Sequence, residues 1–210
     1  RVLRVVLGIT NPYKAGINGT EVSGVNTYLS TANSTLAYVN KKLSSTVTNF
    51  THINAVEQLF WKMSDPVTGR KIYVRPTTIL VNPEKRYELK RILNATEVRS
   101  GDTDEATSTQ TLAANPLDIK YQLVTSPIAQ AILDEETALS DSEVKEYLVF
   151  GDFPRAFGYR EVYPMKTEVA PPNNPAEFRQ DIVLQVKASE FGVPYVYDPR
   201  YAVLSTAEAA

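Results

Sequence analysis

The sequence is most informative at residues 149–163, which read VFGDFPRAFGYREVY. Tyr147 to Phe150 form a short apolar run, and the Gly151-Asp152 dipeptide that follows is typical of a turn. Residues 157–162 then return to a pattern that suits a pleated, half-buried surface. The stretch therefore predicts two strands joined through a bend. By periodicity alone, the simplest interpretation is one more hairpin in a mixed fold.

Composition excludes several classes of protein. The chain has 210 residues, enough for one domain or two small ones that bury roughly 70% of the extended-chain surface. It contains no cysteine, which excludes disulfide frameworks, thiolate metal sites and cysteine nucleophiles. His52 is the only histidine, and we interpret it as a capping or surface residue rather than a general base. We therefore expect no catalytic residue, no cofactor and no metal site.

Charge and hydropathy point to a soluble chain. The net charge is −2, so no global field draws the chain to nucleic acid or to an anionic membrane. No apolar run reaches the ~18 residues of a membrane span. The acidic group Asp102, Asp104 and Glu105 lacks the spacing of a calcium loop, and we interpret it as part of a solvated loop.

The clearest helix is predicted at residues 51–64. Apolar residues recur there at three- to four-residue spacing, Asn49 or Thr51 can cap the start, and Pro66 lies just beyond the end. Trp61 in this helix is expected to be a packing residue. Upstream, the pattern predicts a short strand within residues 1–10 and one or two helical turns near residues 35–43.

The middle of the chain alternates strands and helices. Asn82-Pro83-Glu84 places a cap, a first-turn proline and an acid in their favoured order, which predicts a helix to about Leu93. The other elements expected here are strands at 71–74 and 78–81, a loop at 94–115, a strand at 117–123, a helix at 126–133 and an acidic connector at 134–146.

The C-terminal part is predicted to be β-rich. Residues 165–169 predict a brief strand, and residues 170–175 form a proline-rich turn. Alternation over residues 178–188 predicts the longest strand, which Gly192 would end. Two further runs, residues 193–197 and 201–204, are expected to close the fold as a pair.

The order of these elements resembles the major capsid proteins of tailed bacteriophages, which share the Hong Kong 97 phage capsid fold. The resemblance covers residues 50–206 and rests on five pieces: the helix from Thr51, the Thr78–Pro83 strand-helix unit, the strand ending Val124-Thr125-Ser126-Pro127, the Gly151-Asp152-Phe153 strand pair, and the long 178–187 strand leading to Asp-Pro-Arg-Tyr-Ala-Val. It implies an α+β fold with a mostly antiparallel sheet, a long spine-like helix and a second, axial lobe. Residues 1–75 and 150–210 would form the peripheral-type domain and residues 76–149 the axial-type domain.

The resemblance also implies a function and partners. The chain would be a structural capsid subunit that joins itself in hexamers and pentamers of an icosahedral shell. That shell would enclose double-stranded DNA, contacted only non-specifically, with portal, scaffold or decoration proteins as further partners. The expected location is the virion, assembled in the host bacterial cytoplasm. The sequence opens at Arg1 without Met, and the extended arm and long loop of the family would lie before it, so self-crosslinking is not expected.

Three alternatives remain open. A bacterial nanocompartment shell resembles the same fold but encloses cargo enzymes. A hydrolase with paired carboxylates could use residues such as Asp152 and Glu161, although turn formation and solvent exposure explain both residues. A binding module for sugar or protein is suggested by the 12 tyrosines, among them Tyr195, Tyr197 and Tyr201.

Overall fold

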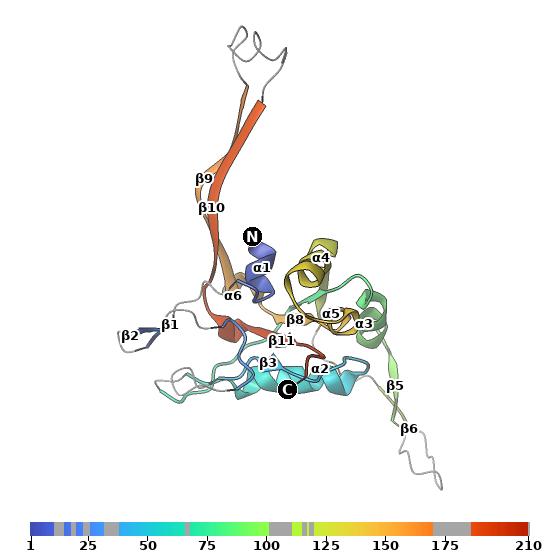
Figure 1. The fold of residues 1–210 in the computed structure, drawn as a ribbon. Coiled ribbons are helices and arrows are strands. Elements are labelled where there is room, and N and C mark those ends of the chain that lie inside the picture. The colour runs from blue at the N-terminus through green and yellow to red at the C-terminus, as the bar shows by residue number, and fades with distance from the viewer. Residues whose placement is uncertain are drawn as a thin grey trace.

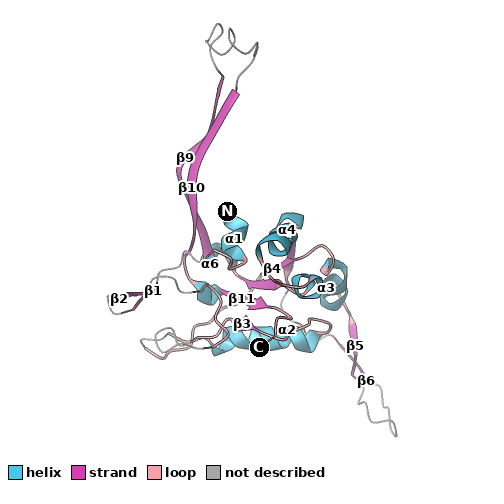
Figure 2. Ribbon diagram, in the orientation of Figure 1, coloured by secondary structure: helices cyan, strands magenta, loops and turns pink. Residues whose placement is uncertain are grey.

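The computed structural model describes residues 1–10, 15–17, 20–22, 26–31, 38–65, 68–100, 111–114, 117, 120–169 and 186–209 (Figure 1). The helices among these residues are α1 (Val2–Val6), α2 (Phe50–Lys62), α3 (Arg86–Leu93), α4 (Pro127–Glu136), α5 (Asp141–Lys145), α6 (Phe153–Ala156) and the 3-10 helix η1 (Pro199–Tyr201). The strands are β1 (Ala15–Ile17), β2 (Thr20–Val22), β3 (Lys41–Lys42), β4 (Thr78–Val81), β5 (Glu97–Ser100), β6 (Thr111–Ala114), β7 (Gln122–Thr125), β8 (Leu148–Gly151), β9 (Phe157–Val169), β10 (Val186–Val196) and β11 (Ala202–Ser205) (Figure 2). The fold is a mixed α+β architecture.

A five-stranded sheet with the order β3-β11-β8-β4-β7 forms the centre of the molecule. Its two outer pairings, β3 with β11 and β4 with β7, are parallel, and its two inner pairings are antiparallel. The sheet was predicted to be mostly antiparallel, but it is mixed. The inner strands have continuous apolar sequences because helices cover the sheet on both faces.

Alternate residues of β8 enter two separate hydrophobic cores. Leu148 and Phe150 belong to the core that α2 covers, whereas Val149 belongs to the core on the other face. The second core also contains Leu133 of α4 and Leu7, which follows α1. The sheet thus lies between α2 on one face and α1 and α4 on the other (Figure 1).

Helix α2 confirms the predicted helix at residues 51–64. The side chain of Asn49 caps it by accepting from the amides of Thr51 and His52. Ile53, Val56 and Phe60 are fully buried, so the apolar stripe faces the sheet as its spacing indicates. Local signals were sufficient here because cap and periodicity agree.

The Gly151-Asp152 dipeptide does not join a hairpin. β8 pairs with β4 and β11 in the central sheet, α6 follows Asp152, and β9 pairs with β10 outside that sheet. Gly151 is needed for close packing, because a Cβ there would lie 2.4 Å from the carbonyl oxygen of Tyr201. The glycine therefore marks a close approach of β8 to the backbone at Tyr201, and sequence alone cannot distinguish such a glycine from one in a turn.

β9 and β10 form a long two-stranded antiparallel ribbon that projects from the body (Figure 1). The predicted brief strand at 165–169 is the outer end of β9. Gly192 lies inside β10 and does not end a strand, and residues 178–185 of the predicted long strand lie outside the described residues. The predicted closing pair is wrong, because residues 193–196 belong to β10 while β11 pairs with β3 and β8.

The predicted strand near the N-terminus is a helix. Valine-rich α1 has high strand propensity, but Val5 is buried and Val6 and the following Leu7 pack into the second core, and this burial outweighs local preference. Tyr28 closes this corner by donating its hydroxyl to the Val6 carbonyl at 2.6 Å. In the predicted helical segment near residues 35–43, Lys41 and Lys42 instead form strand β3.

The middle segment confirms some predictions and corrects others. β4 and α4 form close to their predicted places, Ser126 caps α4, and α5 makes the acidic connector partly helical. The strand predicted at 117–123 is shifted, because β7 begins only at Gln122. Helix α3 begins at Arg86, later than the helix start that was predicted from Asn82. The Asn82 side chain does not cap the helix but donates to the Val144 carbonyl. Residues 71–74 form only a bridge between Lys71 and Ser64, and the predicted loop at 94–115 contains the paired strands β5 and β6.

Candidate functional site

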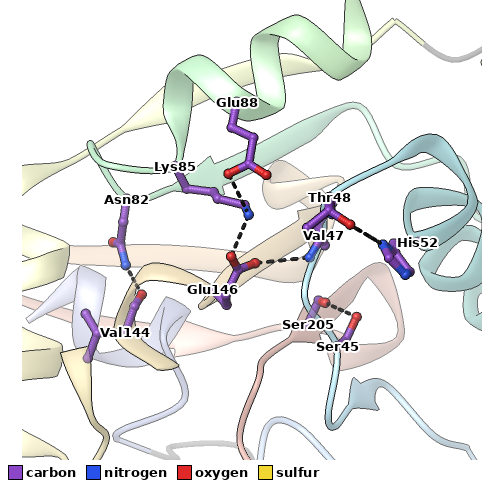
Figure 3. Close-up of polar contacts among 10 residues, drawn as sticks. All are labelled: Ser45, Val47, Thr48, His52, Asn82, Lys85, Glu88, Val144, Glu146 and Ser205. Atoms are coloured by element: carbon purple, nitrogen blue, oxygen red, sulfur yellow. Dashed lines mark hydrogen bonds and ion pairs between the residues drawn. The ribbon is translucent and has the colours of Figure 1, made fainter. Parts of the chain in front are cut away.

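A buried lysine is the centre of the most unusual polar cluster (Figure 3). Lys85, just before α3, is only 1% exposed. Its Nζ lies 2.5 Å from Oε1 of Glu146 and 2.8 Å from Oε2 of Glu88. A buried ammonium is stable only when it is paired in this way.

Glu146 extends this cluster to the segment before α2. Its Oε2 accepts a hydrogen bond of 3.0 Å from the amide of Val47. The Asn82 side-chain amide donates to the Val144 carbonyl, and Ser205 bonds Ser45 at 3.1 Å nearby (Figure 3). We call Lys85, Glu88, Glu146 and the Val47 amide the ionic junction. The ionic junction connects the α3 and α5 segments to the segment between β3 and α2.

Three phenols donate hydrogen bonds of 2.6 Å: Tyr28 to the Val6 carbonyl and Tyr147 to the Leu7 carbonyl in buried positions, and Tyr121 to the Glu57 carboxylate in a half-buried one. Burial raises the pKa of Tyr28 and of Tyr147 well above the usual phenol value. Burial, followed by the Glu57 contact, raises the pKa of Tyr121 strongly. All three are therefore neutral donors with a structural role.

The ribbon carries an apolar strip that the chain leaves in solvent. Phe191, Val193 and Tyr195 lie two residues apart on β10 and so share one face, and Tyr163 of β9 stacks on Phe191 with ring centroids 5.9 Å apart. Phe191 is 48% and Val193 51% exposed. We call these four residues the ribbon strip. Contiguous exposed apolar surface of this kind marks a contact with another molecule.

A hollow between α3 and β7 is basic. It has a volume of about 620 Å³ and is lined by two cations of α3, Arg86 and Lys90, and by Lys120 in the segment before β7. Tyr87 and Arg91 line a neighbouring hollow that shares Lys90. None of these cations forms an ion pair with another described residue.

A second hollow, at α1, α5 and the end of α4, is acidic. It has a volume of about 530 Å³ and is lined by Glu136, Glu143 and Glu208. Glu136 pairs with Arg4, and Glu208 pairs with Lys41 at 2.6 Å. The hydroxyl and amide of Ser140 bond Glu143 and lower its pKa, so this carboxylate stays ionised.

The residues that the sequence offered for catalysis do not come together. Asp152 lies before α6 and pairs with Arg155 at 3.3 Å, whereas Glu161 is exposed on β9. Neither carboxylate lines the hollows described above. His52 lies in the first turn of α2, where its ring Nδ1 lies 3.3 Å from both the amide and the hydroxyl of Thr48 and its own amide donates to Asn49. Glu161 is exposed as expected, whereas Asp152 lies at the start of α6 instead of in a turn.

The aromatic candidates divide between surface and core. Trp61 was expected to pack but is 54% exposed. Tyr195 lies in the ribbon strip and Tyr197 just beyond β10 is also exposed, while Tyr201 packs against both cores and lies under the Arg155 guanidinium at 5.8 Å. The Asp102, Asp104 and Glu105 group lies outside the described residues. In the part of the chain that is described, no cluster of three or more His, Asp or Glu residues could hold a metal ion.

Sequence analysis missed the ionic junction and the basic hollow. Lys85 follows the Asn-Pro-Glu signal of a helix start and so looks like an ordinary surface lysine. Its partner Glu146 is 61 residues away, and Val47 is 99 residues from Glu146. The only local signal is the charge pattern, four bases in residues 85–91 against six acids in residues 134–146.

Comparison with known proteins agrees with a structural role. A family model described as phage capsid protein matches residues 5–205. The chain therefore belongs to the phage capsid protein family, a family of structural components of the virion. A search of curated proteins finds no match. Among the described helices, none is long and apolar enough to cross a membrane.

Proposed function

We propose that the chain is the major capsid subunit of a tailed bacteriophage or prophage, with the Hong Kong 97 type of fold. It assembles into hexamers and pentamers of an icosahedral shell around packaged double-stranded DNA. The family match, the mixed sheet between helical layers and the long α2 support this proposal. Residues 1–75 and 150–210 would form the peripheral-type domain and residues 76–149 the axial-type domain.

The observation that carries the proposal is the β9–β10 ribbon. A two-stranded ribbon is marginally stable in water, yet β9 alone has 13 residues and would extend roughly 40 Å. Beyond its base, the ribbon leaves both long edges and the ribbon strip without a partner among the described residues. A repeated subunit solves this problem, because each copy can cover the ribbon of its neighbour.

The other partners follow from the same role. Portal, scaffold or decoration proteins would bind the finished lattice, and DNA would be held non-specifically, since the net charge is −2. Assembly would take place in the host cytoplasm. A nanocompartment shell would need the same surfaces, but the family match favours the phage capsid.

Electron microscopy of the full-length gene product, with mass from light scattering, tests the proposal. Shells, hexamers or pentamers are the expected result. A protein that stays monomeric at high concentration, with and without its phage gene neighbours, would contradict a capsid role.

A further inference from the structure

The charged side chains of the lobe that contains α3, α4 and α5 are separated into two poles. Residues 85–91 carry four bases and one acid, and that acid, Glu88, contacts buried Lys85. The remaining cations of α3, together with Lys120, are exposed around the basic hollow. Residues 134–146 carry six carboxylates and one lysine. The two segments thus carry opposite charge although the whole chain is nearly neutral.

The two poles lie at opposite ends of α4. Gln130, in the first half of this helix, donates to Glu84 just before α3 at 3.2 Å. At the other end, Glu136 pairs with Arg4 of α1. Figure 1 shows α1 on one side of α4 and α3 on the other. Among the described residues, the two segments meet only at the buried Lys85–Glu146 pair, and the exposed charges give one subunit a basic side and an acidic side at opposite ends of α4.

Both sides carry exposed charged side chains that form no ion pair with another described residue. Asp134, Glu135 and Asp141 are exposed and form no ion pair with another described residue. On the basic side, Tyr87 is 78% exposed beside Lys90 and Arg91. Tyrosine and arginine are the residues enriched at the centre of protein interfaces, and unpaired charges of opposite sign favour docking.

We propose that the basic side of one subunit docks on the acidic end of α4 of the next copy, in a head-to-tail contact. This inference rests on the proposed function and names the partner surface. Two different complementary patches on one chain make a heterologous contact, which closes into a ring when the rotation between copies permits. The apolar residues Leu93, Leu117 and Leu123 in the basic hollow suit an inserted side chain of a protein better than a phosphate backbone.

Charge reversal in the full-length protein tests this contact. Lys90→Glu/Arg91→Glu and Asp134→Lys/Glu135→Lys should each slow assembly, followed by light scattering at low salt, by roughly tenfold or more. The chain with all four substitutions should regain most of the rate, because its reversed sides again match. Lys62→Glu/Arg70→Glu, which reverses two exposed cations near the end of α2, is the matched control and should assemble normally.

The outcomes separate this inference from the proposed function. Wild-type assembly with normal assembly of both double variants would overturn the contact and leave the capsid role intact. Loss of nucleic-acid binding by Lys90→Glu/Arg91→Glu at an unchanged assembly rate, measured with a double-stranded DNA probe, would assign the basic side to DNA and also overturn it. Failure of the wild-type protein to assemble would contradict both proposals.

Discussion

At the scale of single residues, the ionic junction shows how burial changes the role of a common side chain. Lys85 has 1% of its surface exposed and contacts two carboxylates, so its charge is compensated only while both the α3 and α5 segments are in place. Such a pair adds little net stability compared with apolar residues, but breaking it is costly. Its effect is to specify one arrangement of the segments.

We expect Lys85→Met to lower the free energy of unfolding by about 3–5 kcal/mol, because it leaves Glu146 buried without a counter-charge. Glu146→Gln in the same chain should recover part of this loss, since glutamine can still accept from the Val47 amide. Urea denaturation of the subunit measures both values. Lys90→Met on the exposed side of the same helix is the control, expected to change stability by less than about 0.5 kcal/mol. Equal effects at the two lysines would contradict the role of the junction.

The buried phenols predict a loss of stability in alkali. Burial raises the pKa of Tyr28, Tyr121 and Tyr147 in the folded state, whereas in the unfolded chain they ionise near the ordinary value of about 10. Above pH 10 the unfolded state therefore binds fewer protons than the folded state, and stability falls as pH rises. Below pH 10 their contribution is fully present.

Each buried phenol should contribute a slope of up to about 1.4 kcal/mol per pH unit above pH 10. Unfolding measured between pH 9 and 11.5 gives the total slope. Tyr28→Phe should reduce the slope, whereas Tyr73→Phe should not, because Tyr73 is exposed. An unchanged slope in Tyr28→Phe would show that this phenol titrates in the folded protein.

At the scale of elements, predictability follows the range of the signal. Helix α2 and the cap of α4 were predictable because Asn49 and Ser126 act on the next three residues. The partners of each strand were not predictable, because the apolar sequence of β8 suits a hairpin and the centre of a sheet equally well. For helix α1 the local signal gave the wrong prediction, because burial of Val5 and Val6 overrides the strand preference of valine.

The candidate site was predictable only in part. The sequence favoured turn and surface roles for Asp152 and Glu161, and the structure places Asp152 at the start of α6 and Glu161 exposed on β9. The ribbon strip itself depends on the register that stacks Tyr163 on Phe191 across 28 residues of chain, and no local pattern reports that pairing. Lys85 could not be found because a buried lysine has the same sequence context as an exposed one.

The ribbon strip gives a prediction for the whole element. Phe191→Asp places a charge in the strip and should abolish shells and larger assemblies, because a partner would have to bury that charge. Since Phe191 is half exposed in the subunit, folding of the subunit itself should be little changed. Electron microscopy and circular dichroism measure the two effects.

Ala188→Asp is the matched control for this experiment. Ala188 is exposed on the same strand but lies outside the ribbon strip, on the far side of the register shift between Ser189 and Phe191. The control should assemble at a rate close to that of the wild-type protein. Normal shells from Phe191→Asp would show that the ribbon strip is not an assembly contact.

At the scale of the whole molecule, the body of the subunit is packed within one chain, whereas the β9–β10 ribbon is largely exposed. The central sheet has helices on both faces and two closed cores, and the ionic junction is satisfied within one chain. Among the described strands, β9 and β10 pair only with each other, so the outward amides along the edges of the ribbon have no strand partner there. A subunit built this way should fold alone and become complete only in a lattice.

Hydrogen exchange can separate these two parts of the molecule. On assembly, outward amides of β9 and β10 should exchange at least roughly tenfold more slowly, because a neighbouring copy covers them. The Val47 amide, bonded to Glu146 inside the subunit, should be equally protected before and after assembly. Fragment-resolved mass spectrometry of unassembled subunits and of purified shells supplies the comparison. Ribbon amides that exchange at the same rate in both forms would place the ribbon in solvent on the shell surface, and the apolar strip would then need another partner.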